Sequence, residues 1–164
     1  MANTAIDPEK AHDYYLTTVT MISVSAHGKN NVMAATRTLS LSAKPPLIGI
    51  SMGTSRFSYD AIQTSGEFVV NIAATDQVDL ALKVGKTSGR DLDKFAEFAI
   101  PIRSATKVNA PLIDGCAANM ECKLVNTVEV GDHMLVVGEI VAMHVDEEKV
   151  PAARLRGKNR EVGS

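Results

Sequence analysis

Hydrophobic and polar residues alternate along much of the chain, and this period of two predicts β-strands. The β-branched run TTVTMISVSA (17–26) and the run at 31–41 flank a short turn, so they are predicted to form a hairpin. Pro45 and Pro46 then mark a corner, because proline cannot donate a ladder hydrogen bond. The apolar segment LIGISM (47–52) after this corner is typical of a strand buried on both faces.

The second half of the chain carries three more strand patterns. EFVVNIA (67–73) is followed by two long runs, Cys116–Val128 and Asp132–Asp146. In the first long run, alternation predicts a core-facing set: Cys116, Ala118, Met120, Cys122 and Leu124. The other set is predicted to be more exposed: Ala117, Asn119, Glu121 and Lys123. An uninterrupted pleat in the second run would place His133 and His144 on opposite faces.

Two segments carry helical signals. Thr54 or Ser55 is predicted to cap a short helix that reaches about Thr64 and is broken by Gly66. Residues 76–84 have apolar side chains at helical spacing, and the basic, glycine-containing loop GKTSGRDLDKF (85–95) follows. Many strands with few inserted helices favour an antiparallel β-barrel. A doubly wound parallel fold would need more helices between its strands.

Length and charge narrow the class of protein. The 164 residues are predicted to form one domain at 17–150, with a lead-in at 1–16 and a polar tail at 151–164. A net charge of −2 gives no electrostatic footprint for nucleic acid or an anionic membrane. No apolar run reaches the roughly 18–20 residues that span a bilayer, and the start of the chain lacks a signal-peptide pattern. A cytoplasmic protein is predicted.

The two cysteines are predicted to stay unpaired. If their segment is a strand, Cys116 and Cys122 are separated by about 20 Å. A disulfide needs Cα atoms within about 7 Å, so two buried thiols are favoured over a redox or metal role. No pair of histidines has metal-ligand spacing supported by further donors, and no metal site is expected.

Residues suited to a phosphate group stand together at the entrance of the first predicted helix. Thr54, Ser55 and Arg56 supply hydroxyls and a guanidinium beside main-chain N–H groups. A plain capping role for Ser55 and a solvated surface charge for Arg56 are the alternatives. Because the surrounding stretch 32–60 contains no side chain that looks like a nucleophile or metal site, the chemistry is assigned to a bound cofactor.

Five segments in order resemble the flavin reductase-like family, whose fold is the FMN-binding split barrel. They are NVMAATRTLSLSAKPPL (31–47), SMGTSRFSYDAIQTSGEFVVNI (51–72), GKTSGRDLDKF (85–95), NAPLIDGCAANMECKL (109–124) and GDHMLVVGEI (131–140). The resemblance implies a mainly β, split antiparallel barrel of Greek-key type with a few short helices. It further implies a homodimer that binds FMN, or alternatively FAD, near the subunit interface and uses NAD(P)H as co-substrate.

The resemblance also implies roles for individual residues. The isoalloxazine ring would lie along Asn31, Val32, Met33, Ala34, Ala35, Thr36, Arg37 and Thr38. The phosphate would be bound near Ser51, Ser55 and Arg56. Further phosphate or dinucleotide contacts would come from Lys86, Thr87, Ser88 and Arg90. His133 would face the flavin and the incoming nicotinamide as a positioning group, and it is the candidate catalytic residue. An ordinary strand, a disordered surface loop at 85–95 and a structural histidine are the competing interpretations.

The chain departs from the family pattern at three positions. Lys44 stands where an acidic residue often precedes the two prolines, and Ala34 and Arg37 stand where a hydroxyl and a larger aromatic residue are frequent. The leading hypothesis is an NAD(P)H:flavin oxidoreductase that supplies a monooxygenase or another electron acceptor. The alternatives are a flavoredoxin-like electron-transfer protein that contains FMN and a flavin-binding module without turnover.

Overall fold

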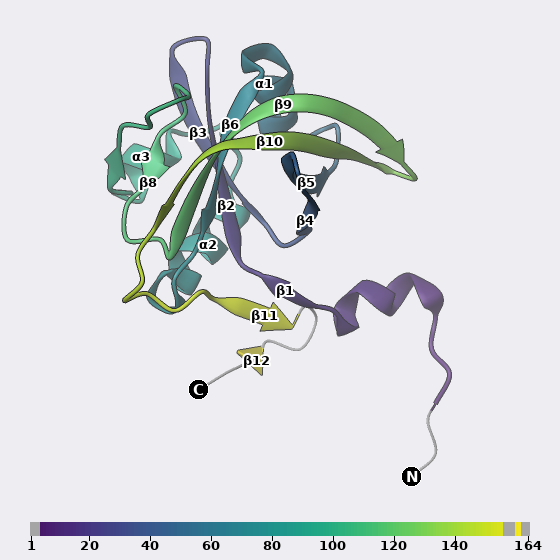
Figure 1. The fold of residues 1–164 in the computed structure, drawn as a ribbon. Helices are drawn as coiled ribbons and strands as arrows, with labels where there is room; N and C mark the ends of the chain where they lie inside the picture. Colours follow the sequence, from purple (N-terminus) through teal and green to yellow (C-terminus); the bar gives the residue numbers. More distant parts are fainter. Residues whose placement is uncertain (1–3, 156–159, 162–164) are drawn as a thin grey trace.

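In a computed structural model, which describes residues 4–155, 160 and 161, the chain is mainly β and all of its described strand pairs are antiparallel. The main sheet has seven strands in the order β3-β2-β6-β9-β10-β5-β4 (Figure 1). Their bounds are β2 (Thr20–Ala26), β3 (Lys29–Ala35), β4 (Thr38–Ala43), β5 (Pro46–Met52), β6 (Glu67–Ile72), β9 (Ala118–Val130) and β10 (His133–Val145). The predicted antiparallel barrel is confirmed.

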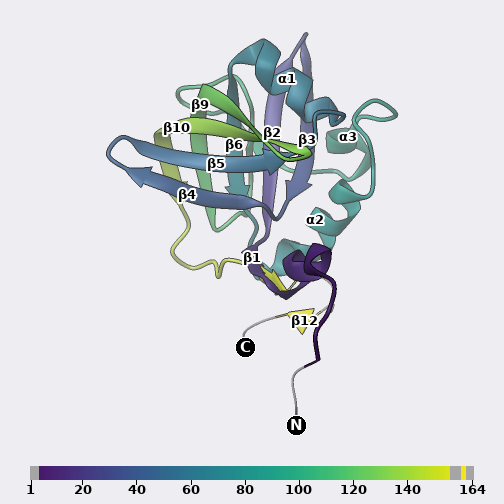
Figure 2. The ribbon, with the colours of Figure 1, turned by 90° about the vertical axis from the view of Figure 1, so that its right-hand side faces the viewer.

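The sheet curls so that its two edge strands meet at one corner. β3 and β4 lie at opposite edges, yet only Thr36 and Arg37 separate them along the chain. The hydroxyl of Thr20 donates to the carbonyl oxygen of Ala35 at 2.8 Å and lies 3.0 Å from the hydroxyl of Thr38, which joins the two edges. In Figure 2, β4, β5, β9 and β10 run across the view while β2 and β3 run nearly upright. The predicted strand at 31–41 is therefore two strands, because the chain crosses between edges at this corner.

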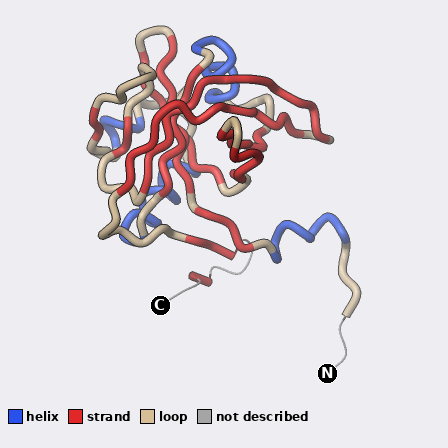
Figure 3. The backbone as a smooth tube through the Cα atoms, viewed as in Figure 1, coloured by secondary structure: helices blue, strands red, loops and turns tan. Residues whose placement is uncertain are grey.

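Short helices surround the sheet. They are η1 (Pro8–Tyr14), α1 (Phe57–Ser65), η2 (Thr75–Gln77), α2 (Val78–Gly85) and α3 (Lys94–Glu97). α1 packs against β2, whereas α2 and α3 pack against β3. Gly66 ends α1 with a φ of 68°, as predicted, because glycine adopts this left-handed conformation without strain. η1 extends away from the sheet toward the N-terminus (Figure 3).

Two small sheets complete the fold. One contains β1 (Leu16–Thr18), β11 (Ala153–Leu155) and β12 (Arg160–Glu161), and the other contains β7 (Ile102–Arg103) and β8 (Leu112–Ile113). Residues 1–3 of the predicted lead-in and 156–159 and 162–164 of the predicted tail lie outside the described residues. Within the described part, no helix combines the length and apolar character needed to cross a membrane.

Aliphatic and aromatic side chains fill the barrel. Ile22, Ile50, Phe68 and Val136 are completely buried in one cluster together with Cys122. Cys116 is buried in a second cluster between the sheet and α2. Both cysteines are free, and burial raises the pKa of each thiol to about 12. These are therefore unreactive core thiols at neutral pH.

One face of β9 contradicts the prediction from alternation. Asn119 and Glu121 belong to the set predicted to be more exposed, but they retain only 1% and 0% exposure. The segment between β7 and β8 covers them, and the main-chain N–H groups of Thr106 and Lys107 donate to the Glu121 carboxylate at 2.9 and 2.5 Å. His144 donates to the same carboxylate at 2.7 Å. Alternation of polar and apolar residues shows which side chains share a strand face. It does not show whether solvent or an irregular segment of the chain covers that face.

This covered face is held by a network of polar side chains. Glu67 accepts hydrogen bonds from the main chain and side chain of Asn109 at 2.6 and 2.7 Å, and it pairs with Lys123 at 2.5 Å. Asn71 joins β6 to Asn119 on β9 and to the main chain of Ile113. Across the described residues, every buried side-chain nitrogen and oxygen has a hydrogen-bond partner. We call this set, Glu67, Asn71, Asn119 and Glu121, the carboxamide–carboxylate network.

Candidate functional site

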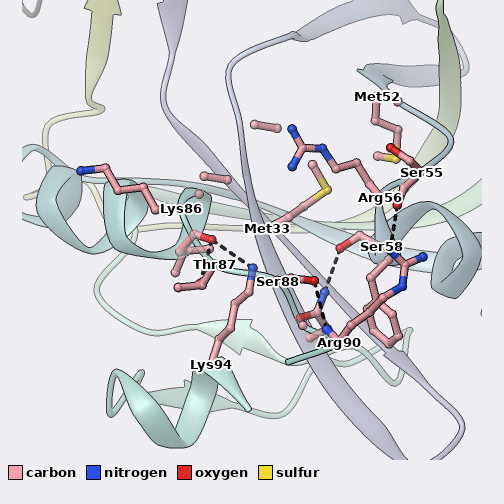
Figure 4. A pocket seen from close by; sticks show the side chains of 18 of the residues that line it. Met33, Met52, Ser55, Arg56, Ser58, Lys86, Thr87, Ser88, Arg90 and Lys94 are labelled. Atoms are coloured by element: carbon pink, nitrogen blue, oxygen red, sulfur yellow. Dashed lines mark hydrogen bonds between the residues drawn. The ribbon is translucent and has the colours of Figure 1, made fainter. Parts of the chain in front are cut away.

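A cavity of about 380 Å³ opens where β3 ends, where β5 leads into α1, and where the loop after α2 crosses between them (Figure 4). The barrel corner places these three segments together, because the chain passes from one sheet edge to the other at Thr36 and Arg37. The cavity thus lies at the junction of segments that are far apart in the sequence.

Most of the predicted site residues line this cavity. Those that do are Asn31, Met33, Ala34, Ala35, Thr36, Arg37, Ser51, Ser55, Arg56, Lys86, Thr87, Ser88, Arg90 and His133. Two do not. Val32 is completely buried in the cluster behind β3, and the hydroxyl of Thr38 lies at the barrel seam 3.0 Å from that of Thr20. Thr54, which was grouped with Ser55 and Arg56 as a phosphate-binding residue, does not line the cavity either.

The charged residues around the cavity all have the same sign. The lining contains Arg37, Arg56, Lys86, Arg90 and Lys94, and no Asp or Glu occurs among the described lining residues. Arg56 extends from the start of α1, and Lys86 lies on the opposite side of the view in Figure 4. Several cations facing one hollow without carboxylates create a positive potential that favours an anion.

The start of α1 contributes main-chain groups to this potential. The predicted cap by Thr54 or Ser55 is wrong, because Arg56 is the N-cap residue and no side chain bonds the first turn in the usual capping manner. The Ser55 hydroxyl is one residue too early for that role and faces the cavity instead. An uncapped helix N-terminus keeps its N–H groups available for an anionic group.

The loop after α2 is fixed to α1 by Arg90. Its guanidinium donates to the carbonyl oxygen of Ser55 at 2.9 Å and to Asp60 at 3.4 Å, and it lies 6.0 Å from the centre of the Phe57 ring. Gly89 approaches Asn31 so closely that a Cβ atom would lie 2.1 Å from the side-chain oxygen. A larger residue at this position would require the Asn31 side chain or the loop to shift, so the absence of a side chain lets the loop lie close to β3 as one wall of the cavity.

Lys94 is the cavity cation that is most enclosed. It retains 3% exposure, and its ammonium donates to the carbonyl oxygens of Val32 and Val84 at 2.8 and 3.0 Å. These bonds tie the edge strand β3 to the end of α2. Burial, together with a smaller contribution from the positive charge of Arg56, lowers the pKa of Lys94 to about 8.

At the start of β10, the His133 ring lies between the carboxylate of Asp132 and the guanidinium of Arg37. Its Nδ1 lies 2.6 Å from Asp132, and its Nε2 contacts the guanidinium of Arg37. Since arginine only donates, Nε2 is the acceptor, and Nδ1 therefore carries the ring proton and donates to Asp132. The hydrogen bond from His133 lowers the pKa of Asp132. In the neutral imidazole, the contact with Arg37 thus selects the tautomer with its proton on Nδ1.

A second cavity of about 560 Å³ adjoins the first on the far side of this histidine. Arg37, Ser51 and His133 line both cavities, and Glu9 and His12 from η1 line only the second. The pair Arg37–His133 therefore forms the boundary between two compartments. Among the described residues, no cluster of His, Cys, Asp and Glu has the arrangement of a metal site.

A family model described as a flavin reductase like domain matches residues 12–163. The chain belongs to the flavin reductase-like family. An uncharacterized protein of Archaeoglobus fulgidus is 38% identical over 122 residues, which cover 74% of this chain and 69% of that protein. A flavin reductase of Pseudomonas putida is 27% identical over 161 residues, which cover 96% of this chain and 91% of that protein. The resemblance inferred from the sequence segments is confirmed.

Two solved structures have the same fold over nearly their whole length. The flavoredoxin of Methanosarcina acetivorans has a TM-score of 0.87 and 25% identity, with 100% of this chain and 93% of that chain covered. The FMN-binding protein of Thermus thermophilus with bound 1-cyclohex-2-enone has a TM-score of 0.82 and 27% identity, with coverage of 98% and 94%. The similarity therefore extends through all the elements that form the cavity.

Several lining residues were not predicted from the sequence. They are Met52, Gly53, Phe57, Ser58, Val84, Gly85, Gly89 and Lys94. Gly85, Gly89 and Lys94 belong to the basic, glycine-containing loop at 85–95, and this membership was their only signal. The burial of Lys94 carried no signal, since a lysine in a polar segment is usually exposed and only the fold buries it.

Proposed function

We propose that this protein is an NAD(P)H-dependent flavin oxidoreductase that binds FMN, or alternatively FAD, in the cationic cavity. The observation that carries the proposal is the lining itself, in which five basic side chains and the uncapped start of α1 meet without a carboxylate. A flavin nucleotide matches this chemistry, because it joins a flat ring to an anionic phosphate. Membership of the flavin reductase-like family supports the same ligand class.

The residues divide between the two ends of such a ligand. Ala34 and Ala35 at the end of β3 leave room for a flat ring to approach the strand, and neighbouring main-chain groups can bond its polar edge. Ser55, Arg56 and the first N–H groups of α1 would hold the phosphate. Lys86 and Thr87 would complete the opposite wall.

The second cavity is proposed as the approach for the nicotinamide. When bound, the flavin supplies a ring that accepts hydride. Hydride transfer depends on close alignment of the two rings, so His133 is proposed to position the incoming group and not to remove a proton. The fixed tautomer described above suits this role, since its Nε2 already accepts from Arg37.

Anaerobic titration tests the proposal. The flavin-loaded protein is titrated with NADH and then with NADPH while the visible absorbance of the flavin is recorded. We expect one of the two nucleotides to bleach the flavin stoichiometrically. A purified protein that neither carries nor takes up FMN or FAD would contradict the flavin site itself.

A flavoredoxin-like electron-transfer protein is the second candidate. The likeness to the flavoredoxin of Methanosarcina acetivorans over the whole chain favours it. Tight FMN binding without bleaching by NADH or NADPH, together with reduction by a reduced ferredoxin-type donor, would support this function over the first.

The protein is also proposed to act as a homodimer. Val128 and Val130 on β9 and Met143 and Val145 on β10 are exposed, and this long hairpin extends from the body of the protein in Figure 1. Val128 and Val130 lie near the tip of the hairpin, whereas Met143 and Val145 pair with Met120 and Ala118 at its other end, so the four side chains form two separate exposed apolar patches. Exposed apolar patches are typical of protein interfaces. Light scattering should give twice the chain mass, and Val128→Lys with Met143→Lys should shift it toward the monomer.

A further inference from the structure

Lys94 is a buried cation whose hydrogen bonds satisfy only part of its ammonium group. An ammonium carries three N–H donors, and the carbonyl oxygens of Val32 and Val84 accept two of them. No third acceptor is found for it in the described part of the chain. The residue lines the cavity, and Figure 4 shows its ammonium beside Thr87 at the cavity wall.

The charges around Lys94 do not compensate it. Arg56 reaches the cavity from α1, and Lys86 and Arg90 belong to the loop that crosses it. The adjacent carboxylate of Asp93 accepts instead from the main-chain N–H groups of Phe95 and Ala96 at the start of α3. A buried ion is normally paired, because removing it from water costs several kcal/mol. The described protein groups supply carbonyl dipoles but no opposite charge.

We propose that Lys94 is the buried counter-charge for the phosphate of the flavin nucleotide, so that nucleotide binding is coupled to uptake of a proton. The proposal rests on the proposed function, because it names the part of the ligand that this site requires. The two hydrogen bonds from Lys94 to carbonyl oxygens hold β3 and α2 together as cavity walls. The third N–H donor of Lys94 is directed to the bound anion. Lys94 is thus a phosphate-binding residue that selects nucleotides over unphosphorylated flavin.

The protonation of Lys94 gives the proposal a direct signature. Burial lowers the pKa of Lys94 to about 8, so part of the free protein carries a neutral amine at pH 8.5. A bound phosphate favours the ammonium and draws a proton from solution. The phosphate of FMN does not contribute at this pH, because its second pKa is about 6 and it is already a dianion.

Calorimetric titration with FMN at pH 8.5, in buffers of different ionisation enthalpy, measures this proton. Wild type is expected to take up at least about half a proton per FMN bound. Lys94→Met should take up none and should bind FMN about 10 to 100-fold more weakly at pH 7, while riboflavin affinity changes less than about threefold. Lys83→Met is the matched control, because it removes an exposed lysine from α2 that does not line the cavity.

Each outcome decides the inference. If wild type binds no FMN, the proposed function fails and this inference fails with it. If wild type binds FMN without proton uptake, the inference alone is overturned. If Lys94→Met weakens FMN binding and riboflavin binding equally, Lys94 only holds β3 and α2 together, and the inference is also overturned. If Lys94→Met does not fold, proton uptake by wild type still decides.

Discussion

The protein buries ionised groups in two places and surrounds them in opposite ways. On the covered face of β9, the carboxylate of Glu121 receives hydrogen bonds from Thr106, Lys107 and His144. Around the cavity, Lys94 and Arg56 face further cations and no carboxylate among the described lining residues. The first region is electrostatically complete within the chain. The second has no opposite charge among the described lining residues, which is why we assign the first to folding and propose ligand binding for the second.

The pKa values of the two regions express the same difference. Burial alone would raise the pKa of Glu121, but hydrogen bonds from Thr106, His144 and Lys107 outweigh it and lower the pKa to about 2. The environment therefore favours its charged form. The environment of Lys94 disfavours the charged form and lowers its pKa to about 8. A group whose charge the protein disfavours is a candidate for a ligand to stabilise.

The largest expected effect is on the folding side of this comparison. Glu121→Ala leaves the N–H groups of Thr106 and Lys107 without their acceptor, and we expect a loss of about 3 kcal/mol or more in the free energy of unfolding. FMN affinity should be nearly unchanged in the protein that remains folded. Urea unfolding measures the loss, and Glu129→Ala on the exposed part of the same strand is the control. Equal stability of the two variants would show that the carboxamide–carboxylate network does not stabilise the fold.

Alkaline pH should remove the destabilising contribution of the Lys94 charge in the protein without ligand. Because the pKa of Lys94 is about 8 in the folded state and 10.5 in the reference state, at this residue the unfolded chain holds more protons between these values. The Lys94 contribution to the free energy of unfolding therefore rises with pH across that window, whereas the two buried thiols act in the opposite direction equally in wild type and Lys94→Met. We expect wild type to gain about 2 kcal/mol relative to Lys94→Met between pH 7.5 and 9.5 in urea unfolding. Parallel curves for the two proteins would show that the Lys94 charge is not disfavoured.

Gly89→Ala should disturb the cavity without unfolding the barrel. The added Cβ would lie 2.1 Å from the side-chain oxygen of Asn31, so either this side chain, which donates to Ser58, or the loop that carries Arg90 must shift. We expect FMN affinity to fall about tenfold with a change of less than about 1 kcal/mol in stability. Gly85→Ala is the graded control, since its Cβ would lie 3.3 Å from that of Ala34. The loop would have no binding role if both variants bound FMN like wild type.

The smallest expected effect concerns the boundary between the two cavities. Arg37→Met releases Nε2 of His133, and this nitrogen then becomes available to an electrophile. We expect modification of His133 by diethyl pyrocarbonate to accelerate several-fold when followed by mass spectrometry. His27, which is exposed in a distant turn, provides the internal reference. An unchanged ratio of the two rates would contradict the assigned tautomer.

The sequence predicted the local elements of the fold better than it predicted which faces of these elements are buried. Alternation found the strands, and the corner at Pro45 and Pro46 and the helix end at Gly66 follow from the chemistry of these residues. Asn119 and Glu121 were misplaced, because the irregular segment that covers them leaves no periodic pattern. The single strand predicted at 31–41 was wrong for a related reason, since only barrel closure requires the break at Thr36 and Arg37.

The same limit applies to the cavity. Contiguous motifs predicted the segment from Asn31 to Arg37, apart from Val32, and the residues Ser55, Arg56 and Lys86, because each belongs to a segment that resembles the flavin reductase-like family. Lys94 and the contact between Gly89 and Asn31 depend on packing between distant segments. A single sequence does not carry the burial that turns an ordinary lysine into a candidate ligand group.

Equilibrium titration of the flavin-free wild-type protein with FMN and with riboflavin, followed by flavin fluorescence at two salt concentrations, tests the central claim most directly. A cationic cavity that an external phosphate completes should bind one FMN per chain and bind riboflavin at least about tenfold more weakly. Added salt should weaken FMN binding more than riboflavin binding, because it screens the cavity cations. Failure to bind FMN, or equal affinity for both flavins at either salt concentration, would contradict the claim.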